Sequence, residues 1–152
     1  MSFPKVRKFV PQNPSKYLGD YNAIYARSSW ELKFLRWCDT SSAVIKYNSE
    51  DVVIPYWSNA EQKMRNYHVD FYIEYFKADG SKKELLIEIK PHVQTLPPKK
   101  GRKDKDTFLN EQVTYQVNQD KWNAAREFAK KNNMEFVVFT EYELGLKPRP
   151  KR

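Results

Sequence analysis

The stretch Glu84-Leu85-Leu86-Ile87-Glu88-Ile89-Lys90 decides the fold, because a short and mostly apolar run of this kind predicts a buried β-strand. A second run, Tyr67 to Phe76, is rich in aromatic and β-branched residues and predicts another strand. Ala78-Asp79-Gly80-Ser81 lies between the two runs and is typical of a turn, so we expect an antiparallel hairpin. Asp70 falls within the first strand, eighteen residues before Glu88.

The length of that turn decides whether the two acidic residues can act together, because alternate residues of a strand share a face. A two-residue turn at Asp79-Gly80 sets Asp70 opposite Ile89 and puts Asp70 and Glu88 on opposite faces. A three-residue loop with Gly80 in a bulge sets Asp70 opposite Lys90 and brings the acids to one face. A shared site therefore requires the second register or a compensating bulge.

Asp70 and Glu88 are candidate ligands for a divalent metal, since Mg²⁺ prefers carboxylate oxygens and keeps several of its waters. Mn²⁺ is an alternative ion, and the backbone carbonyl of Ile89 is a further candidate ligand. Lys90 could orient an attacking water or stabilise charge in the transition state of phosphodiester cleavage. The competing interpretation makes Glu88-Ile89-Lys90 one exposed face of an amphipathic strand. Asp is disfavoured in strands, so Asp70 favours the functional interpretation.

A helix is predicted to begin near Ser28, because Ser28-Ser29-Trp30-Glu31 fits a capping box. Trp30, Phe34 and Cys38 then recur at helical spacing. Glu31 has two interpretations that do not exclude each other. It can complete the cap, or it can add a further catalytic and metal-binding carboxylate from this helix.

The remaining segments predict a mixed sheet flanked by helices, which is an α/β fold. We expect a short strand at 44–47, an edge strand at 52–57, a short helix near 108–117, a second helix capped by Asn118 or Asp120, and a buried strand at 134–140. Lys121 would then lie in the first turn of the second helix, either solvated or catalytic. A chain of 152 residues supports one domain, 1–152, with a basic extended arm at 1–20 and a mobile basic tail at 147–152.

The chain carries 27 Lys and Arg residues against 19 Asp and Glu, a net charge of +8 that favours a polyanionic partner such as nucleic acid. Basic residues gather in a loop after the predicted hairpin, and we expect them to contact DNA phosphates: Lys99, Lys100, Arg102, Lys103 and Lys105. Because this loop follows Lys90 closely in the chain, it is also expected to close over the DNA backbone beside the acids.

Cysteine content and hydropathy exclude two further classes of protein. The single cysteine, Cys38, excludes an intrachain disulfide and a Cys-based zinc cluster. The absence of a long apolar run or a signal-peptide core predicts no membrane partner.

The order Glu31, Asp70, Glu88-Ile89-Lys90 and Lys121 resembles the PD-(D/E)xK nuclease superfamily, most closely its TnsA-type branch. The similar features include Tyr67-His68-Val69-Asp70-Phe71 and the Pro91 that follows Lys90; Val69 replaces the usual Pro before the Asp. Over nearly its whole length the chain also resembles the small head-completion proteins of T-even-type tailed phages. The resemblance implies a restriction-endonuclease-like core and catalytic roles for Glu31 and Lys121.

The resemblance implies a Mg²⁺-dependent DNA nuclease that acts on packaged DNA ends during phage head completion. Its expected partners are double-stranded DNA and phage head, portal or neck proteins, and its expected locations are the virion and the host cytoplasm. Two alternatives stay open. One is a non-enzymatic, basic DNA-binding virion protein that plugs or stabilises the head-neck vertex, and the other is a nuclease that acts on RNA.

Overall fold

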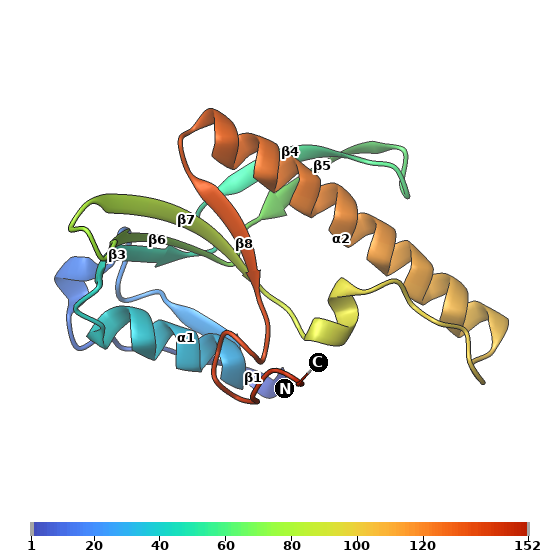
Figure 1. The fold of residues 1–152 in the computed structure, drawn as a ribbon, viewed down its shortest axis with the longest axis horizontal. Helices are drawn as coiled ribbons and strands as arrows, with labels where there is room; N and C mark the ends of the chain where they lie inside the picture. Colours follow the sequence, from blue (N-terminus) through green and yellow to red (C-terminus); the bar gives the residue numbers. More distant parts are fainter. Residues whose placement is uncertain (1, 152) are drawn as a thin grey trace.

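The computed structural model describes residues 2–151, which form a four-stranded sheet with a helix on each face (Figure 1). The strand order is β3 (Val44–Ser49), β6 (Phe71–Phe76), β7 (Lys82–Ile89) and β8 (Glu135–Phe139). The first three strands are antiparallel neighbours, and β8 lies parallel to β7. The expected mixed sheet is therefore confirmed.

The two faces of β7 pack against different helices, because its side chains alternate between them. Leu85, Ile87 and Ile89 belong to one hydrophobic cluster, together with Phe34 and Cys38 of α1 (Ser29–Thr40). Leu86 belongs to a second cluster with the α2 residues Trp122, Ala125 and Ala129. Glu88 alternates with Leu86, so it lies on the face that α2 (Lys105–Lys131) covers.

The N-terminal region folds against α1. Strand β1 (Ser2–Lys8) pairs with β2 (Tyr25–Ser28), and a short 3-10 helix, η1 (Pro14–Lys16), lies between them. The ammonium of Lys16 donates hydrogen bonds to the carbonyls of Cys38, Asp39 and Ser41 at the end of α1, at 2.7–3.1 Å. Residues 2–20 therefore contribute β1 and η1 to the folded domain, which differs from the extended arm predicted for this segment.

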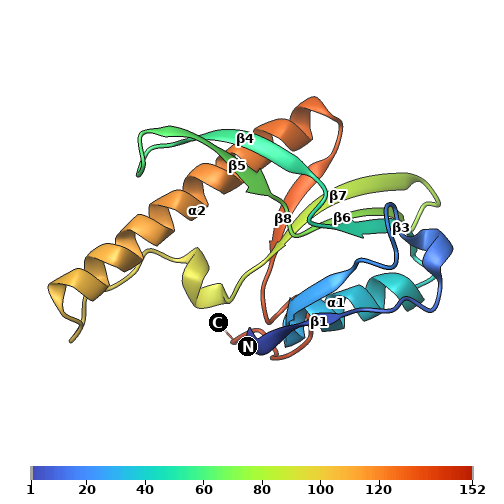
Figure 2. The same cartoon turned by 180° about the vertical axis from the view of Figure 1, so that it is seen from behind.

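The predicted long strand from Tyr67 to Phe76 is two strands. Strand β5 (Lys63–His68) ends before Asp70, which lies in a bend, and β6 begins directly after it. The bend is held by backbone hydrogen bonds from Val69 to Val52 and from Glu50 to Asp70, each 3.0 Å long. Strand β5 pairs with β4 (Val53–Ser58) in a separate two-stranded hairpin that projects from the sheet along α2 (Figure 2).

Both predicted registers of the β6–β7 hairpin are wrong. Phe71 pairs with Ile87 and Phe76 with Lys82, so the same register continued by one residue sets Asp70 opposite Glu88. The connection is tightened because Asp79 Oδ1 accepts hydrogen bonds from the backbone N–H and the hydroxyl of Ser81. Gly80 adopts a φ of 84°, which favours glycine. The two acids nevertheless share a face.

The two helices predicted after residue 107 are one continuous α2. Asp104 caps it, since Asp104 Oδ1 accepts a 2.7 Å hydrogen bond from the backbone N–H of Thr107. Asn118 and Asp120, predicted as caps, are buried inside the helix. Asp120 instead accepts hydrogen bonds from Asn59 in the β4–β5 turn: 2.8 Å from its backbone N–H and 2.9 Å from its side-chain amide. This long-range contact fixes the hairpin to α2.

The link between β7 and α2 contains the 3-10 helix η2 (His92–Thr95), and the backbone N–H of His92 donates a 2.7 Å hydrogen bond to Glu141 after β8. Near the C-terminus, Arg149 pairs with Glu143. No helix within residues 2–151 is both long and apolar enough to cross a membrane.

Candidate active site

Asp70 and Glu88 lie side by side at the point where the sheet meets the β4–β5 hairpin. Because Asp70 occupies the bend before β6, its Oδ2 accepts a 2.9 Å hydrogen bond from the backbone N–H of Ile89. Glu88 is 6% exposed, so an acidic side chain is buried next to a second carboxylate. Buried charges of one sign are costly unless something compensates them, and such pairs are frequent at functional sites.

The electrostatics of Asp70 reflect this crowding. Burial raises the pKa of the Asp70 carboxyl well above its ordinary value, and the neighbouring Glu88 carboxylate raises it further. The hydrogen bond from Ile89 lowers the pKa, Glu31 raises it, and the ammonium of Lys90 lowers it. The site therefore favours added positive charge.

Lys90 supplies part of that charge. It lies two residues after Glu88, on the same side of the chain, with its Nζ 3.6 Å from Glu88 Oε1. The backbone N–H of Lys90 donates a 3.0 Å hydrogen bond to Phe139 in β8, which fixes the start of the Lys90 side chain. The ammonium of Lys90 lies beside Glu88. Because the Lys90 side chain is only partly buried, it remains accessible from solution.

The backbone of Ile89 presents an acceptor at the same place. In a β-strand the N–H and the carbonyl of one residue point toward the same neighbouring strand. The N–H of Ile89 points to Asp70, where β6 has not yet begun. The carbonyl of Ile89 therefore lies on the side of β7 that Asp70 occupies.

Glu31 lies near this pair and also contributes to the helix cap. The Ser28 hydroxyl accepts a 3.1 Å hydrogen bond from the backbone N–H of Glu31, which confirms the predicted N-cap. Burial raises the pKa of the Glu31 carboxyl. Within the described residues, no three His, Cys, Asp or Glu side chains form a group that could hold a metal ion. The structure therefore brings Asp70 and Glu88 together and leaves Glu31 as a neighbouring carboxylate.

Tyr67 is a site residue that the sequence patterns do not single out. Its hydroxyl donates a 2.6 Å hydrogen bond to Glu88 Oε2, and its side chain is buried. Burial raises the pKa of this hydroxyl and the Glu88 carboxylate raises it further, so it remains protonated and able to donate. The sequence shows only that Tyr67 lies three residues before Asp70. The fold is needed to show that Tyr67 contacts Glu88.

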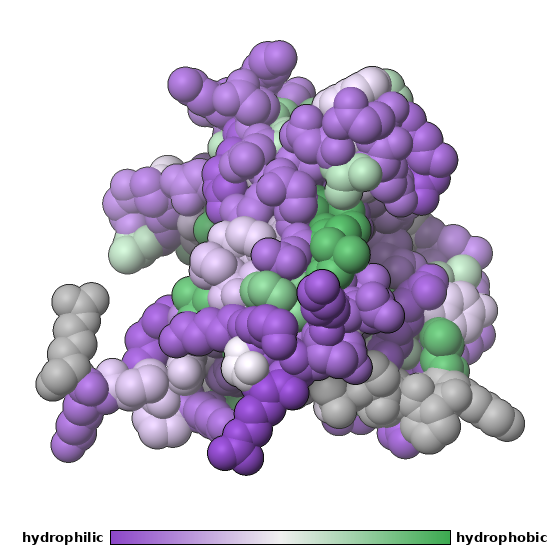
Figure 3. Space-filling view, turned by 90° about the vertical axis from the view of Figure 1, so that its right-hand side faces the viewer, coloured by the Kyte–Doolittle hydropathy of each residue, from purple (hydrophilic) through white to green (hydrophobic). Residues whose placement is uncertain are grey.

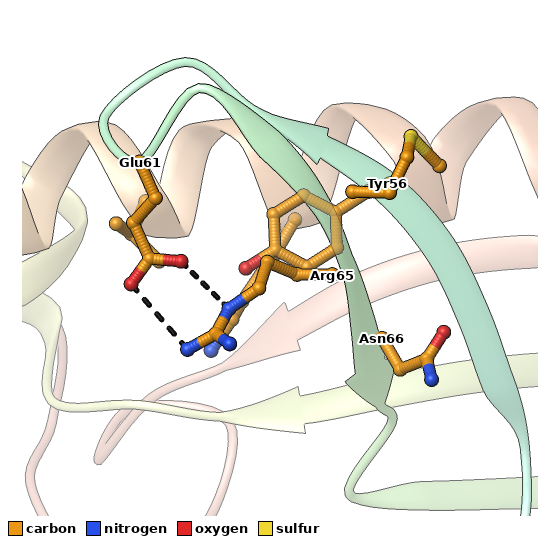
Figure 4. Close-up of a pocket in the computed structure, with 7 residues that line it drawn as sticks. Tyr56, Glu61, Arg65 and Asn66 are labelled. Carbon is orange, nitrogen blue, oxygen red and sulfur yellow. Dashed lines mark hydrogen bonds and ion pairs between the residues drawn. The ribbon is translucent and has the colours of Figure 1, made fainter.

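Lys121 also reaches this region, although its position in α2 differs from the prediction. It lies deep in the long helix, and not in a first turn, with its Nζ 5.7 Å from the centre of the Tyr67 ring. Lys121 also lines a cleft of about 460 Å³ between α2 and the β4–β5 hairpin, shown in Figure 4. It therefore connects that cleft to the residues around Glu88.

The predicted DNA-binding loop lies at the other end of α2 from Lys121. The five basic residues of the loop lie at or before the start of the helix: Lys99, Lys100, Arg102, Lys103 and Lys105. Lys103 Nζ is 2.9 Å from Glu111 Oε2 in the helix. Lys121 is sixteen residues further along the helix, which corresponds to about 24 Å at a rise of 1.5 Å per residue. The expected closure of this loop over the DNA beside the acids, and its contacts with DNA, stay predictions.

Comparisons with known proteins agree with this geometry. Residues 41–141 match the family described as TnsA-like endonuclease N terminal. The chain is also 44% identical over 138 residues to the head completion nuclease of Enterobacteria phage T4, an alignment that covers 88% of this chain and 89% of the phage T4 protein. The fold is accordingly the restriction-endonuclease-like α/β fold that the sequence predicts. The chain belongs to the TnsA-like endonuclease family.

Proposed function

We propose that this protein is a Mg²⁺-dependent DNA nuclease that hydrolyses phosphodiester bonds at packaged DNA ends during phage head completion. The observation that carries the proposal is the proximity of the Asp70 and Glu88 carboxylates, with Lys90 Nζ 3.6 Å from Glu88 Oε1. The family and the phage T4 relative support the same chemistry.

The donor set fits a hard divalent cation. Asp70 and Glu88 provide two crowded carboxylates, and the Ile89 carbonyl provides a third oxygen at the same side of β7. Mg²⁺ sites commonly use one or two carboxylates and retain several waters, so a group of three acidic side chains is not required. When bound there, the ion would lower the pKa of a water and neutralise charge on the phosphate. Mn²⁺ suits the same oxygens.

The other residues are assigned roles by position. Lys90 orients the attacking water or stabilises negative charge that develops on the phosphate, because its ammonium is held beside Glu88. Lys121 adds a second cation on the side of Tyr67. Glu31 tunes the charge of Asp70 and is the candidate for a further carboxylate.

Double-stranded DNA is the proposed substrate, and the net charge of +8 supports a polyanionic partner of this kind. The sequence contains no zinc finger or helix-turn-helix pattern that would read the bases. The side of the molecule to which the start of α2 points is mostly hydrophilic, with a narrow hydrophobic band (Figure 3). Affinity is therefore expected to be independent of sequence and to fall with salt, as counterion release dictates. We further propose docking to phage head, portal or neck proteins, in the virion and the host cytoplasm; the name of the phage T4 relative, a head completion nuclease, supports a role in head completion.

The deciding experiment incubates purified protein with linear and with supercoiled DNA, in Mg²⁺ and in EDTA, and repeats the assay with RNA. We expect cleavage of DNA in Mg²⁺ alone. DNA binding without cleavage of either nucleic acid would instead support a DNA-holding protein that plugs or stabilises the head-neck vertex. Faster cleavage of RNA would identify an RNA nuclease.

Tyr67→Phe is expected to weaken Mg²⁺ binding about tenfold to 100-fold, because groups that position metal ligands typically have effects of this size. The change removes the 2.6 Å hydrogen bond to Glu88 and keeps the buried ring. Binding can be measured by calorimetric titration with Mg²⁺ or Mn²⁺, and cleavage by its half-saturating metal concentration. Tyr72→Phe is the matched control, since it removes a 2.9 Å hydrogen bond to Glu84 on the same sheet. Equal metal affinities for wild type and Tyr67→Phe would contradict a positioning role for Tyr67.

A variant with Gln at all five basic positions of the loop is expected to bind DNA more weakly and with less sensitivity to salt. The slope of the logarithm of the binding constant against the logarithm of the salt concentration should fall by about one unit for each phosphate contact that is lost. The replaced residues are Lys99, Lys100, Arg102, Lys103 and Lys105. Cleavage at saturating DNA should stay near the wild-type rate, because the loop lies at the far end of α2 from Lys121. Fluorescence anisotropy at several salt concentrations measures the first effect. The control replaces Lys130 and Lys131 at the other end of the helix. Wild-type affinity at low salt for the loop variant would make the loop a connector or a protein-docking surface.

A further inference from the structure

The cleft beside Lys121 has the dimensions of a small-molecule site and not of a duplex-binding groove. Its volume is about 460 Å³, and pockets for small ligands are typically about 300–1,000 Å³. Strand β5 contributes Met64, Arg65 and Asn66, strand β4 contributes Tyr56, and α2 contributes Val117 and Lys121.

The walls of this cleft are held in place before any ligand arrives. Glu61 holds Arg65 with both carboxylate oxygens, at 2.6 Å from Nε and 3.4 Å from Nη2 (Figure 4). Asp120 fixes the β4–β5 turn to α2 through its two hydrogen bonds with Asn59. The turn of the hairpin is therefore fixed to α2, and this attachment reduces the ordering that a ligand would have to impose on the cleft.

The lining suits a nucleobase. The guanidinium of Arg65 is planar and is paired with Glu61. Nucleobases stack on guanidinium planes as they do on aromatic rings. Val117 adds an apolar contact from α2. Burial raises the pKa of Tyr56, which keeps its hydroxyl protonated as a further donor.

The cleft is also next to the acidic pair. Lys121 lines it, the Lys121 ammonium is 5.7 Å from the centre of the Tyr67 ring, and the Tyr67 hydroxyl is 2.6 Å from Glu88. A DNA strand whose phosphate lies at Asp70 and Glu88 would therefore pass the cleft with a neighbouring nucleotide.

From this juxtaposition we infer that the cleft is a nucleobase subsite, which takes an unpaired base of the DNA strand that is cut. The inference rests on the proposed nuclease function and extends it to the choice of substrate. A base inside a duplex must leave its stack before it can enter a pocket, and this unstacking weakens binding. A frayed or overhanging end has little or none of this cost, so the protein prefers DNA with unpaired terminal nucleotides.

The test compares binding to a short blunt duplex and to the same duplex with an unpaired overhang, in Ca²⁺ so that the DNA stays intact. Wild type should prefer the overhang about tenfold, which is within the range of effects that stacking of one base has on binding. Arg65→Ala should reduce this preference severalfold, and Tyr56→Phe, which removes the tyrosine hydroxyl from the cleft, should reduce it to a smaller extent. Arg149→Ala removes another glutamate-paired arginine, Asn123→Ala removes an exposed asparagine of α2, and both should keep the preference.

A third DNA carries abasic sugars in the overhang. Loss of the preference with this DNA identifies the base as the bound group, whereas a retained preference means that only the backbone is bound and overturns the inference. Equal binding of blunt and overhanging DNA by wild type, or an undiminished preference in both cleft variants, also overturns it. The nuclease proposal fails on a separate result, the absence of Mg²⁺-dependent cleavage, which the binding assay does not measure.

Discussion

Asp70→Asn and Glu88→Gln are each expected to reduce DNA cleavage about 1,000-fold or more while DNA binding persists. Loss of either carboxylate removes a proposed metal ligand and with it several kcal/mol of transition-state stabilisation, at about tenfold for each 1.4 kcal/mol. Single-turnover cleavage at saturating DNA and Mg²⁺ measures the loss. Glu84→Gln is the control on the same strand, because Glu84 pairs with Tyr72 away from the acids. Wild-type turnover in either variant would rule out its assigned role.

Asp70→Asn should not lose activity through unfolding. A carboxyl whose pKa is raised in the folded protein contributes stability below its unfolded pKa, and that contribution falls as pH rises through the folded pKa. At neutral pH and without metal, Asp70 therefore costs stability. Asp70→Asn should melt at a higher temperature than wild type, and added Mg²⁺ should raise the melting temperature of wild type only. A lower melting temperature for Asp70→Asn would point to a structural role.

Asp120→Ala is expected to lower the free energy of unfolding by about 2–3 kcal/mol, since a buried carboxylate that accepts several hydrogen bonds is lost. The donors left without it are the backbone and side-chain amides of Asn59 and the side chain of Gln116. Urea denaturation followed by circular dichroism measures the change. Asp106→Ala, an exposed change at the start of α2, should cost far less. Similar losses in the two variants would show that Asp120 does not fix the hairpin to α2.

The sequence predicted the elements whose signals are local. The Ser28 cap, the buried stripe around Phe34 and Cys38, and the apolar strand that carries Glu88 are each determined within a few residues. The pairing of Asp70 with Glu88 was also predicted in outline, because a polar residue in an apolar strand favours a functional role. These signals alone do not place the two acids on one face of the sheet, because that depends on the register of the β6–β7 hairpin.

The remaining features depend on contacts between distant residues. The turn at Asp79 and Gly80 suggests two registers, and the structure has a third, in which Asp79 accepts two hydrogen bonds from Ser81. Asp120 resembles a helix cap until Asn59, sixty-one residues away, becomes its partner. The role of Tyr67 likewise requires the break at Asp70, which turns a continuous strand into two strands of different sheets. No local pattern specifies any of these contacts.

The attachment of the N-terminal segment to α1 has a consequence for shortened or tagged forms of the protein. Asp39 accepts hydrogen bonds from the backbone N–H groups of Gln12 and Asn13, while Lys16 binds three carbonyls at the end of the helix. A chain that begins after Lys16 would leave those carbonyls, and the buried Asp39, without these partners. Deletions there should therefore lower expression and increase susceptibility to proteases as strongly as core substitutions do, so trimming from this end is not a neutral way to obtain a minimal nuclease.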